Sequence, residues 1–350
     1  MDFTTDLAGK KCVKCDLDAK FTGVDPKKAW YCKECFIQMV RNKFRSALSK
    51  KKIYKDAEAR GTLVVYDGTP SGAFLLNQVD DALKQITFKR LMIKPTILVL
   101  VSVTGADQIK IVVERVQEIK KVLVESVGWI ICHVACCMYP SGSFPTIPDS
   151  VNSCVGQEKI EEYQLLLAKC SQTTYRNELE RILREKSLQN ISKAVGISKC
   201  MVPDDADDLG RLVINQMCLG RGGCISTLVS VVDKRKNFDL IRPLPDLSKK
   251  EIAIYNYLCG VDKHCIQIAD ENKPKSVQTL TDSFIRNLEE EKFYSTINTV
   301  LSTATKIHSN GADGSLTKCS FCQVEPAESV CMTCTEVRKD LPSDLIQSFS

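Results

Sequence analysis

The stretch TLVVYDGTPSGAFLLNQVDDALKQI, residues 62–86, indicates the fold class of this chain. Its first part is rich in β-branched and aromatic residues and predicts a buried strand over 62–68, which ends in a turn. Its second part has apolar residues at helical spacing and predicts a helix over 71–86. A strand that turns directly into a helix is typical of a βαβ crossover.

The same alternation continues on the carboxyl-terminal side of this stretch. Further strands are predicted over 96–104, 129–137 and 198–203, and further helices over 107–124, 158–169, 175–195 and 206–219. Strands separated by helices pair in parallel and are covered on both faces. We therefore expect an α/β fold with a doubly wound parallel sheet.

The composition is that of a globular protein. Hydrophobic residues make up 44% and charged residues 26% of the 350 positions, which excludes extensive disorder and fibrous repeats. The longest apolar stretch, 127–139, is too short to span a bilayer, and no secretory signal is visible at the N-terminus. We expect a cytoplasmic protein with no membrane partner.

Cysteine spacing indicates a metal-binding module at each end of the chain. Eight of the 18 cysteines form four CxxC pairs, and a cytosolic protein keeps its thiols reduced. Two such pairs supply the four thiolates of a structural zinc site. Redox dithiols, an iron–sulfur cluster and one mixed site that joins the ends remain alternatives. The expected ligands are Cys12, Cys15, Cys32 and Cys35 in one quartet, and Cys319, Cys322, Cys331 and Cys334 in the other.

These modules suggest three regions. Residues 1–55 would form a zinc knuckle followed by a basic amphipathic helix, residues 56–310 the α/β domain, and residues 311–350 a second zinc module with a polar tail. The apolar positions of the expected helix are Phe36, Ile37, Val40, Phe44, Ala47 and Leu48.

Basic charge is concentrated in the first region. Residues 1–60 contain 15 Lys and Arg against 8 Asp and Glu, whereas the net charge of the whole chain is +5. A basic segment of this kind suits a phosphate backbone, and the alternative is a solvated helix face. The candidate RNA-binding residues are Arg41, Lys43, Arg45, Lys50, Lys51, Lys52 and Lys55.

Catalytic signals are weak. The turn after the first strand could receive an anion through Gly68 and Gly72, but it has no lysine and is not a Walker motif. Four Asp within residues 204–208 precede a helix, where the helix dipole alone would favour them. No nucleophile with an activating base can be identified, and we interpret His133 as a packed core histidine.

Four segments carry a resemblance to a known family. CVKC…CKEC precedes FRSALSKKK, LVVYDGTPSG follows, GISKCMVPDDADD precedes LGRGG, and LIRPLPDLSKKEIAIYNYL precedes CSFC…CMTC. With these segments the chain resembles the PP-loop ATP pyrophosphatase family, in the branch that thiolates tRNA. The resemblance covers nearly the whole chain and implies an adenine nucleotide alpha hydrolase-like fold.

The departures from that family concern its chemistry. The family loop reads Ser-Gly-Gly-x-Asp-Ser, and the family's CxxC pair would fall near Asn177 and Glu180, which are not thiols. Cys265 lies near the place of a third family cysteine, while Asp207 and Asp208 match the family's Asp pair and could contact a nucleotide or metal. The degenerate loop consists of Asp67, Gly68, Thr69, Pro70, Ser71 and Gly72.

The resemblance therefore implies a pseudo-enzyme whose ATP binding is doubtful. Such a chain would be the non-catalytic subunit of a heterodimer that 2-thiolates the wobble uridine (mcm5s2U) of cytosolic tRNA for Lys, Glu and Gln. Its partners would be a catalytic PP-loop thiolation subunit, tRNA and, through the complex, a thiocarboxylated ubiquitin-related modifier that supplies sulfur. Two alternatives remain open: an ATP-dependent tRNA sulfurtransferase with Cys265 as nucleophile, and a general RNA-binding zinc protein.

Overall fold

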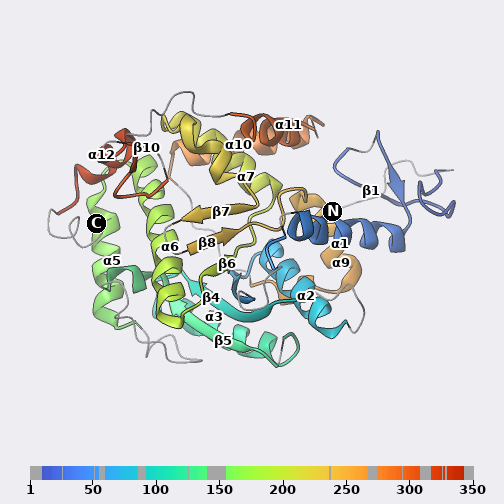
Figure 1. Cartoon of the computed structure of the whole chain (residues 1–350), viewed down its shortest axis with the longest axis horizontal. Helices are drawn as coiled ribbons and strands as arrows, with labels where there is room; N and C mark the ends of the chain where they lie inside the picture. Colours follow the sequence, from blue (N-terminus) through green and yellow to red (C-terminus); the bar gives the residue numbers. More distant parts are fainter. Residues whose placement is uncertain are drawn as a thin grey trace.

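Figure 1 shows the computed structural model of the chain. It describes residues 10–25, 27–50, 52–54, 60–85, 92–124, 126–139, 155–235, 238–266, 274–293, 295–307, 317–324, 326–327 and 329–342. Two of the candidate RNA-binding residues, Lys51 and Lys55, lie outside these ranges.

A six-stranded sheet forms the centre of the molecule, in the order β5-β4-β3-β6-β8-β7. Its strands are β3 (Gly61–Tyr66), β4 (Lys94–Val101), β5 (Gly128–His133), β6 (Lys199–Met201), β7 (Val232–Arg235) and β8 (Phe238–Ile241). All neighbours pair in parallel except β7 with β8, so the expected doubly wound sheet is confirmed. The antiparallel edge was not predicted. Only two residues separate β7 from β8, too few for the crossover that parallel pairing needs.

Helices cover both sides of this sheet. In Figure 1, α1, α2 and α9 lie to the right of the strands, and α5, α6 and α12 to their left. The helices of the α/β region are α2 (Pro70–Lys84), α3 (Ala106–Lys120), α5 (Gln157–Lys169), α6 (Thr173–Val195), α7 (Ala206–Cys218), α8 (Ile225–Leu228) and α9 (Lys249–Cys259), with 3-10 turns η1 (Val134–Met138), η2 (Gly222–Cys224) and η3 (Asp262–His264). The predicted strand over 129–137 ends early, because the His133 side chain accepts a hydrogen bond from the Ala135 N–H and starts η1.

The amino-terminal module joins the main core through its helix. Short strands β1 (Phe21–Thr22) and β2 (Trp30–Tyr31) precede α1 (Lys33–Lys50). The predicted apolar face of α1 is confirmed, since Phe36, Val40 and Phe44 are buried in the same cluster as the sheet. The ring of Phe44 packs edge-on against Phe74 of α2, which packs in turn against Tyr255 of α9.

The carboxyl-terminal part follows α9. It comprises α10 (Val277–Glu290), α11 (Thr296–Ala304), β9 (Thr317–Lys318), β10 (Pro326–Ala327) and α12 (Met332–Arg338). The cysteines of this end are buried in the main core, whereas Cys12 and Cys32 form a small cluster of their own with Ala19. The boundaries suggested at 55 and 310 remain predictions.

Candidate nucleotide cleft and metal centres

A cleft opens where the sheet changes its winding direction. Strands β3 and β6 are neighbours, and from them the chain proceeds toward opposite edges of the sheet. Ligands of doubly wound folds bind beyond the carboxyl ends of the strands at such a switch point. A cavity of about 1130 Å³ lies here, lined by the loop residues Asp67, Thr69 and Ser71 and by Asp204 and Asp208 beyond β6.

The phosphate-loop turn holds a carboxylate of its own. Asp67 Oδ1 accepts hydrogen bonds from the backbone N–H and the hydroxyl of Thr69, 3.1 and 2.7 Å away. The Thr69 hydroxyl oxygen in turn accepts from the Gly72 N–H, which caps α2. A Cβ at Gly72 would lie 2.4 Å from Asp67 Oδ1, so glycine leaves the space that this carboxylate fills. Both donors of Thr69 are thus directed at a carboxylate of the loop itself.

The acidic cluster after β6 is also committed to internal contacts. Asp205 caps α7 by accepting hydrogen bonds from the N–H groups of Asp207 and Asp208. It also accepts a hydrogen bond from the Ser71 hydroxyl at 2.6 Å. Asp207 Oδ2 accepts from the Lys249 N–H at 2.7 Å. Burial raises the pKa of both Asp205 and Asp207.

Of the two family-matched acids, only Asp208 lines the cleft. It forms ion pairs with Lys249 at 2.7 Å and with Arg211 at 3.0 Å. Burial opposes the charge of Lys249, but Asp208 and Asp205 raise its pKa overall. Asp208 is therefore already neutralised by this chain's own cations.

Asn177 and Glu180, near which the resemblance would place a CxxC pair, both lie on α6 and line the cavity. Cys265 lies beside the loop, since the N–H of the next residue, Ile266, donates to the Gly68 carbonyl at 2.9 Å. Burial raises the pKa of Cys265, and the nearby charges of Asp262 and Asp67 raise it further. A raised pKa disfavours a nucleophilic thiolate.

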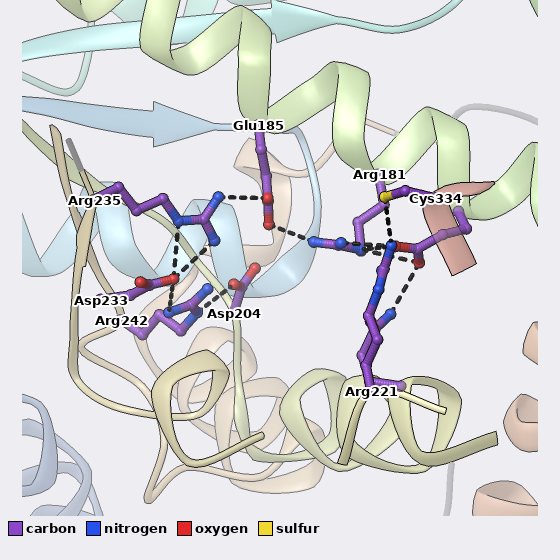
Figure 2. Close-up of polar contacts among 10 residues, drawn as sticks. Arg181, Glu185, Asp204, Arg221, Asp233, Arg235, Arg242 and Cys334 are labelled. Atoms are coloured by element: carbon purple, nitrogen blue, oxygen red, sulfur yellow. Dashed lines mark hydrogen bonds and ion pairs between the residues drawn. The ribbon is translucent and has the colours of Figure 1, made fainter. Parts of the chain in front are cut away.

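A buried network of ion pairs runs behind the cleft (Figure 2). Arg181, which lines the cavity, pairs with Glu178 and Glu185, each at 2.7 Å. Glu185 also pairs with Arg235 of β7 at 2.6 Å. Burial opposes the charge of Glu185, yet Arg181 and Arg235 lower its pKa to about 2. The network continues through Asp233 and Arg242 to Asp204 on the cleft wall.

The amino-terminal cysteines converge as their spacing predicts. The four sulfurs lie within 4.8 Å of one another, and Cys15 Sγ is 3.5 Å from Cys32 Sγ and 3.6 Å from Cys35 Sγ. Four thiolates around one tetrahedral zinc at 2.3 Å would be about 3.8 Å apart. The Lys14 N–H points at Cys12 Sγ, as in a metal knuckle. The donor set fits a zinc ion.

The carboxyl-terminal quartet has the same compactness and lies deeper. Its sulfurs are also within 4.8 Å of one another, and all four residues are buried. The Cys331 N–H donates to Cys319 Sγ, and Arg221 donates to Cys334 Sγ at 3.0 Å. Each end therefore has a complete four-thiol set that could bind a metal such as zinc, and neither quartet borrows a ligand from the other.

The structure separates the basic candidates of α1 into two groups. Arg41 is half-buried and binds Asp81 at 2.6 Å and the Tyr255 hydroxyl at 3.1 Å. Lys43 pairs with Glu251, which is 1% exposed, at 2.7 Å. Arg45 is half-buried, whereas Lys50 and Lys52 are exposed. The RNA-binding assignment remains a prediction, and it is strongest for Lys50 and Lys52.

Sequence reasoning missed Arg221 and Glu178, and it treated Asp205 only as a member of the acidic cluster. These three residues join the loop, the cleft and the carboxyl-terminal module. A signal was present for Glu178, because RNELERILRE over 176–185 alternates charges at helical spacing. Arg221 is the arginine of the LGRGG segment, but nothing in one sequence says that it meets Cys334, 113 residues later.

Comparison with known proteins gives consistent matches. A relative from Caenorhabditis elegans named cytoplasmic tRNA 2-thiolation protein 2 is 66% identical over 339 residues, which cover 97% of this chain and 96% of the relative. A protein of the same name from Caenorhabditis briggsae is 62% identical and covers 100% of this chain and 99% of its own. The sequence model of the cytoplasmic tRNA 2-thiolation protein 2 family matches residues 276–343.

The fold itself is similar to that of a solved enzyme. The U34-tRNA thiolase NcsA from Methanococcus maripaludis, solved with its 4Fe-4S cluster, superposes with a TM-score of 0.57 over 93% of this chain and 95% of that chain. Its sequence identity is 16%, so the likeness concerns the fold alone. Within the described part of the chain, none of the helices combines the length and apolar character needed to cross a membrane.

Proposed function

The chain belongs to the cytoplasmic tRNA 2-thiolation protein 2 family, and from that premise we propose that it is the non-catalytic subunit of a cytoplasmic heterodimer that 2-thiolates tRNA. The partner would be a catalytic PP-loop subunit. The target would be the wobble uridine of tRNA for Lys, Glu and Gln, and the sulfur would come from a thiocarboxylated ubiquitin-related modifier. This chain would contribute scaffolding and tRNA contacts.

The observation that carries the non-catalytic role is the hydrogen bonding of Asp67. Its carboxylate accepts from the Thr69 N–H and hydroxyl, in the turn where an ATP-using relative would bind phosphate. A second anion at the same donors would meet a fixed negative charge in a partly buried site, which costs free energy. The loop is therefore built to keep its shape without a nucleotide.

The thiols support the same role. Sulfur transfer needs a thiolate or a cluster, and Asn177 and Glu180 supply neither on the α6 wall. Cys265 is the thiol beside the loop, and burial raises its pKa. A fold that keeps a cleft but holds its polar groups in internal pairs is suited to stabilise an active partner.

The proposed pathway is tested by a mercury-retardation gel of tRNA from cells that lack this protein. We expect the retarded, thiolated species to disappear and to return with the wild-type chain. Normal retardation in the deleted cells would remove the thiolation role.

The non-catalytic role is tested by complementation with Cys265→Ser, with Cys218→Ser as the matched control on the exposed surface of α7. We expect both variants to restore thiolation fully, and the isolated chain to form no AMP from ATP with tRNA. Loss of thiolation with Cys265→Ser alone, from a variant that keeps its zinc content and fold, would make this chain a catalyst.

A further inference from the structure

Two hollows on the surface share a wall. The first, about 1300 Å³, lies between the amino-terminal module with α1 and the segment formed by α8 and α11. The second, about 710 Å³, lies among residues 52–53, β6, β7 and β9. Ser226 and Ser230 line both hollows, so the two adjoin each other. We call the two hollows together the basic groove.

Its lining carries a strong excess of positive charge. Seven lysines line the basic groove, against two acids, Asp239 and Asp246. The lysines are Lys14, Lys43, Lys50, Lys52, Lys199, Lys234 and Lys318. Lys43 is neutralised by Glu251, whereas Lys50, Lys52 and Lys234 have no carboxylate partner among the described residues. A surface with such an excess attracts anions, including polyanions.

The groove joins the two metal centres. Cys35 of the amino-terminal quartet lines its first part, and Lys318, which precedes Cys319 of the other quartet, lines its second. Lys318 Nζ donates to the Lys234 carbonyl at 3.3 Å, which brings β9 against the edge strand β7. Figure 1 shows β7 between α1 and the carboxyl-terminal module. Residues from both ends of the chain thus contribute to one surface.

The rest of the lining is mixed, with apolar side chains such as Met39, Val229 and Leu301 beside polar ones. Around the lysines lie amides and hydroxyls such as those of Gln38, Asn42 and Ser302, together with the ring of Tyr31. Phosphate and sugar oxygens are bound by lysines, small hydroxyls and amides of this kind.

We propose that the basic groove binds the sugar-phosphate backbone of tRNA, and that its binding surface extends beyond α1 to Lys199, Lys234 and Lys318. The inference rests on the proposed function for the identity of the RNA. In this proposal the edge strand β7 and the carboxyl-terminal module contact the same RNA as the amino-terminal module. Contacts of this class position the RNA and carry no base specificity.

The test is a charge reversal far from α1 in sequence. The full-length, zinc-loaded chain with Lys234→Glu and Lys318→Glu is compared with wild type for binding of fluorescent tRNA at several salt concentrations. The matched control is Lys121→Glu with Lys169→Glu, two exposed lysines that do not line the groove. We expect the groove variant to bind about tenfold more weakly at 0.15 M salt, with a salt slope lower by about two.

Two further measurements distinguish a loss of charge from a loss of folded structure in the groove variant. Lys234→Arg with Lys318→Arg keeps both charges and is expected to bind like wild type, and zinc content should be unchanged in all variants. The proposal is overturned if the wild-type chain does not bind tRNA, if the groove variant binds as wild type does, or if the control loses as much affinity. The mercury gel tests the proposed function separately, because it measures tRNA thiolation and not binding by the basic groove.

Discussion

Arg221 donates a hydrogen bond from Nη2 to the sulfur of Cys334 across 3.0 Å, and both residues are buried. The same guanidinium contacts the carboxylate of Glu178 and donates to the side chain of Gln216. Arg221 therefore links a metal-ligand candidate to the ion-pair network behind the cleft. A hydrogen bond to a ligating thiolate stabilises its charge and fixes its orientation.

Replacing Arg221 with Met should destabilise the whole chain. Glu178, which is 2% exposed, would keep Arg181 but lose its second cation, and breaking a buried pair costs about 3–5 kcal/mol. Urea unfolding followed by circular dichroism measures the loss. Lys339→Gln removes an exposed pair with Glu336 and should leave the stability nearly unchanged. Equal stability of the two variants would contradict a structural role for Arg221.

Loss of the amino-terminal quartet and loss of the carboxyl-terminal quartet should unfold different amounts of the chain. Cys12→Ser with Cys15→Ser should release one zinc and unfold only the amino-terminal knuckle, since these thiols lie outside the main core. Cys331→Ser with Cys334→Ser should release the other zinc and lower the stability of the α/β domain as well. Native mass spectrometry counts the metal, and hydrogen exchange of the sheet reports the spread of unfolding. Unchanged metal content in either variant would contradict the ligand assignment.

Asp67 lies so close to Gly72 that adding a methyl group at this glycine should lower the stability of the chain. Gly72→Ala places a Cβ 2.4 Å from Asp67 Oδ1, so the Asp67 side chain must give up its contacts with Thr69 or the loop must shift, at a cost of about 1–3 kcal/mol. Gly222→Ala is the matched control, because a Cβ there meets no atom within 4 Å. Thermal unfolding compares them. If Gly72→Ala is as stable as its control, the carboxylate does not occupy the loop.

His133 should make stability fall in mild acid. Its side chain is fully buried, and burial lowers its pKa from 6.5 to about 4. The unfolded chain then binds more protons below pH 6.5, so stability present above that pH is lost as the pH falls toward 4. The loss from pH 7 to pH 5 should be about 2 kcal/mol. Urea unfolding of His133→Gln should lack this component, and an identical pH dependence in the variant would contradict it.

The basic residues of the amino-terminal region should separate into two classes. Lys43→Met leaves Glu251 buried without its cation, so it should lower stability more than RNA affinity. Reversing charge at Lys50, Lys51 and Lys52 should weaken tRNA binding. Anisotropy titrations and urea unfolding on the same variants measure both effects. Unchanged tRNA affinity after the triple reversal would make this segment only a solvated face.

Much of the architecture was readable from local patterns. The strand and helix of residues 62–86 appear as β3 and α2, the apolar positions of α1 face the core, and the CxxC spacing leads to two compact quartets. Each of these depends on neighbours within a few residues or on a fixed ligand spacing. The hairpin of β7 and β8 was missed because its strands are four residues each and carry a mixture of charged and apolar side chains.

By itself, the sequence determined the α/β class, the two thiol quartets and the residue types of the loop, because periodicity, spacing and residue identity are local properties. Only the tertiary structure decided which charges are free. It placed Arg41 and Lys43 in ion pairs, directed Asp67 at its own loop, and brought Lys234 and Lys318 to one groove. Charges that lie far apart in the chain acquire partners only when the fold brings them into contact, and the strength of each pair depends on how much water the fold excludes.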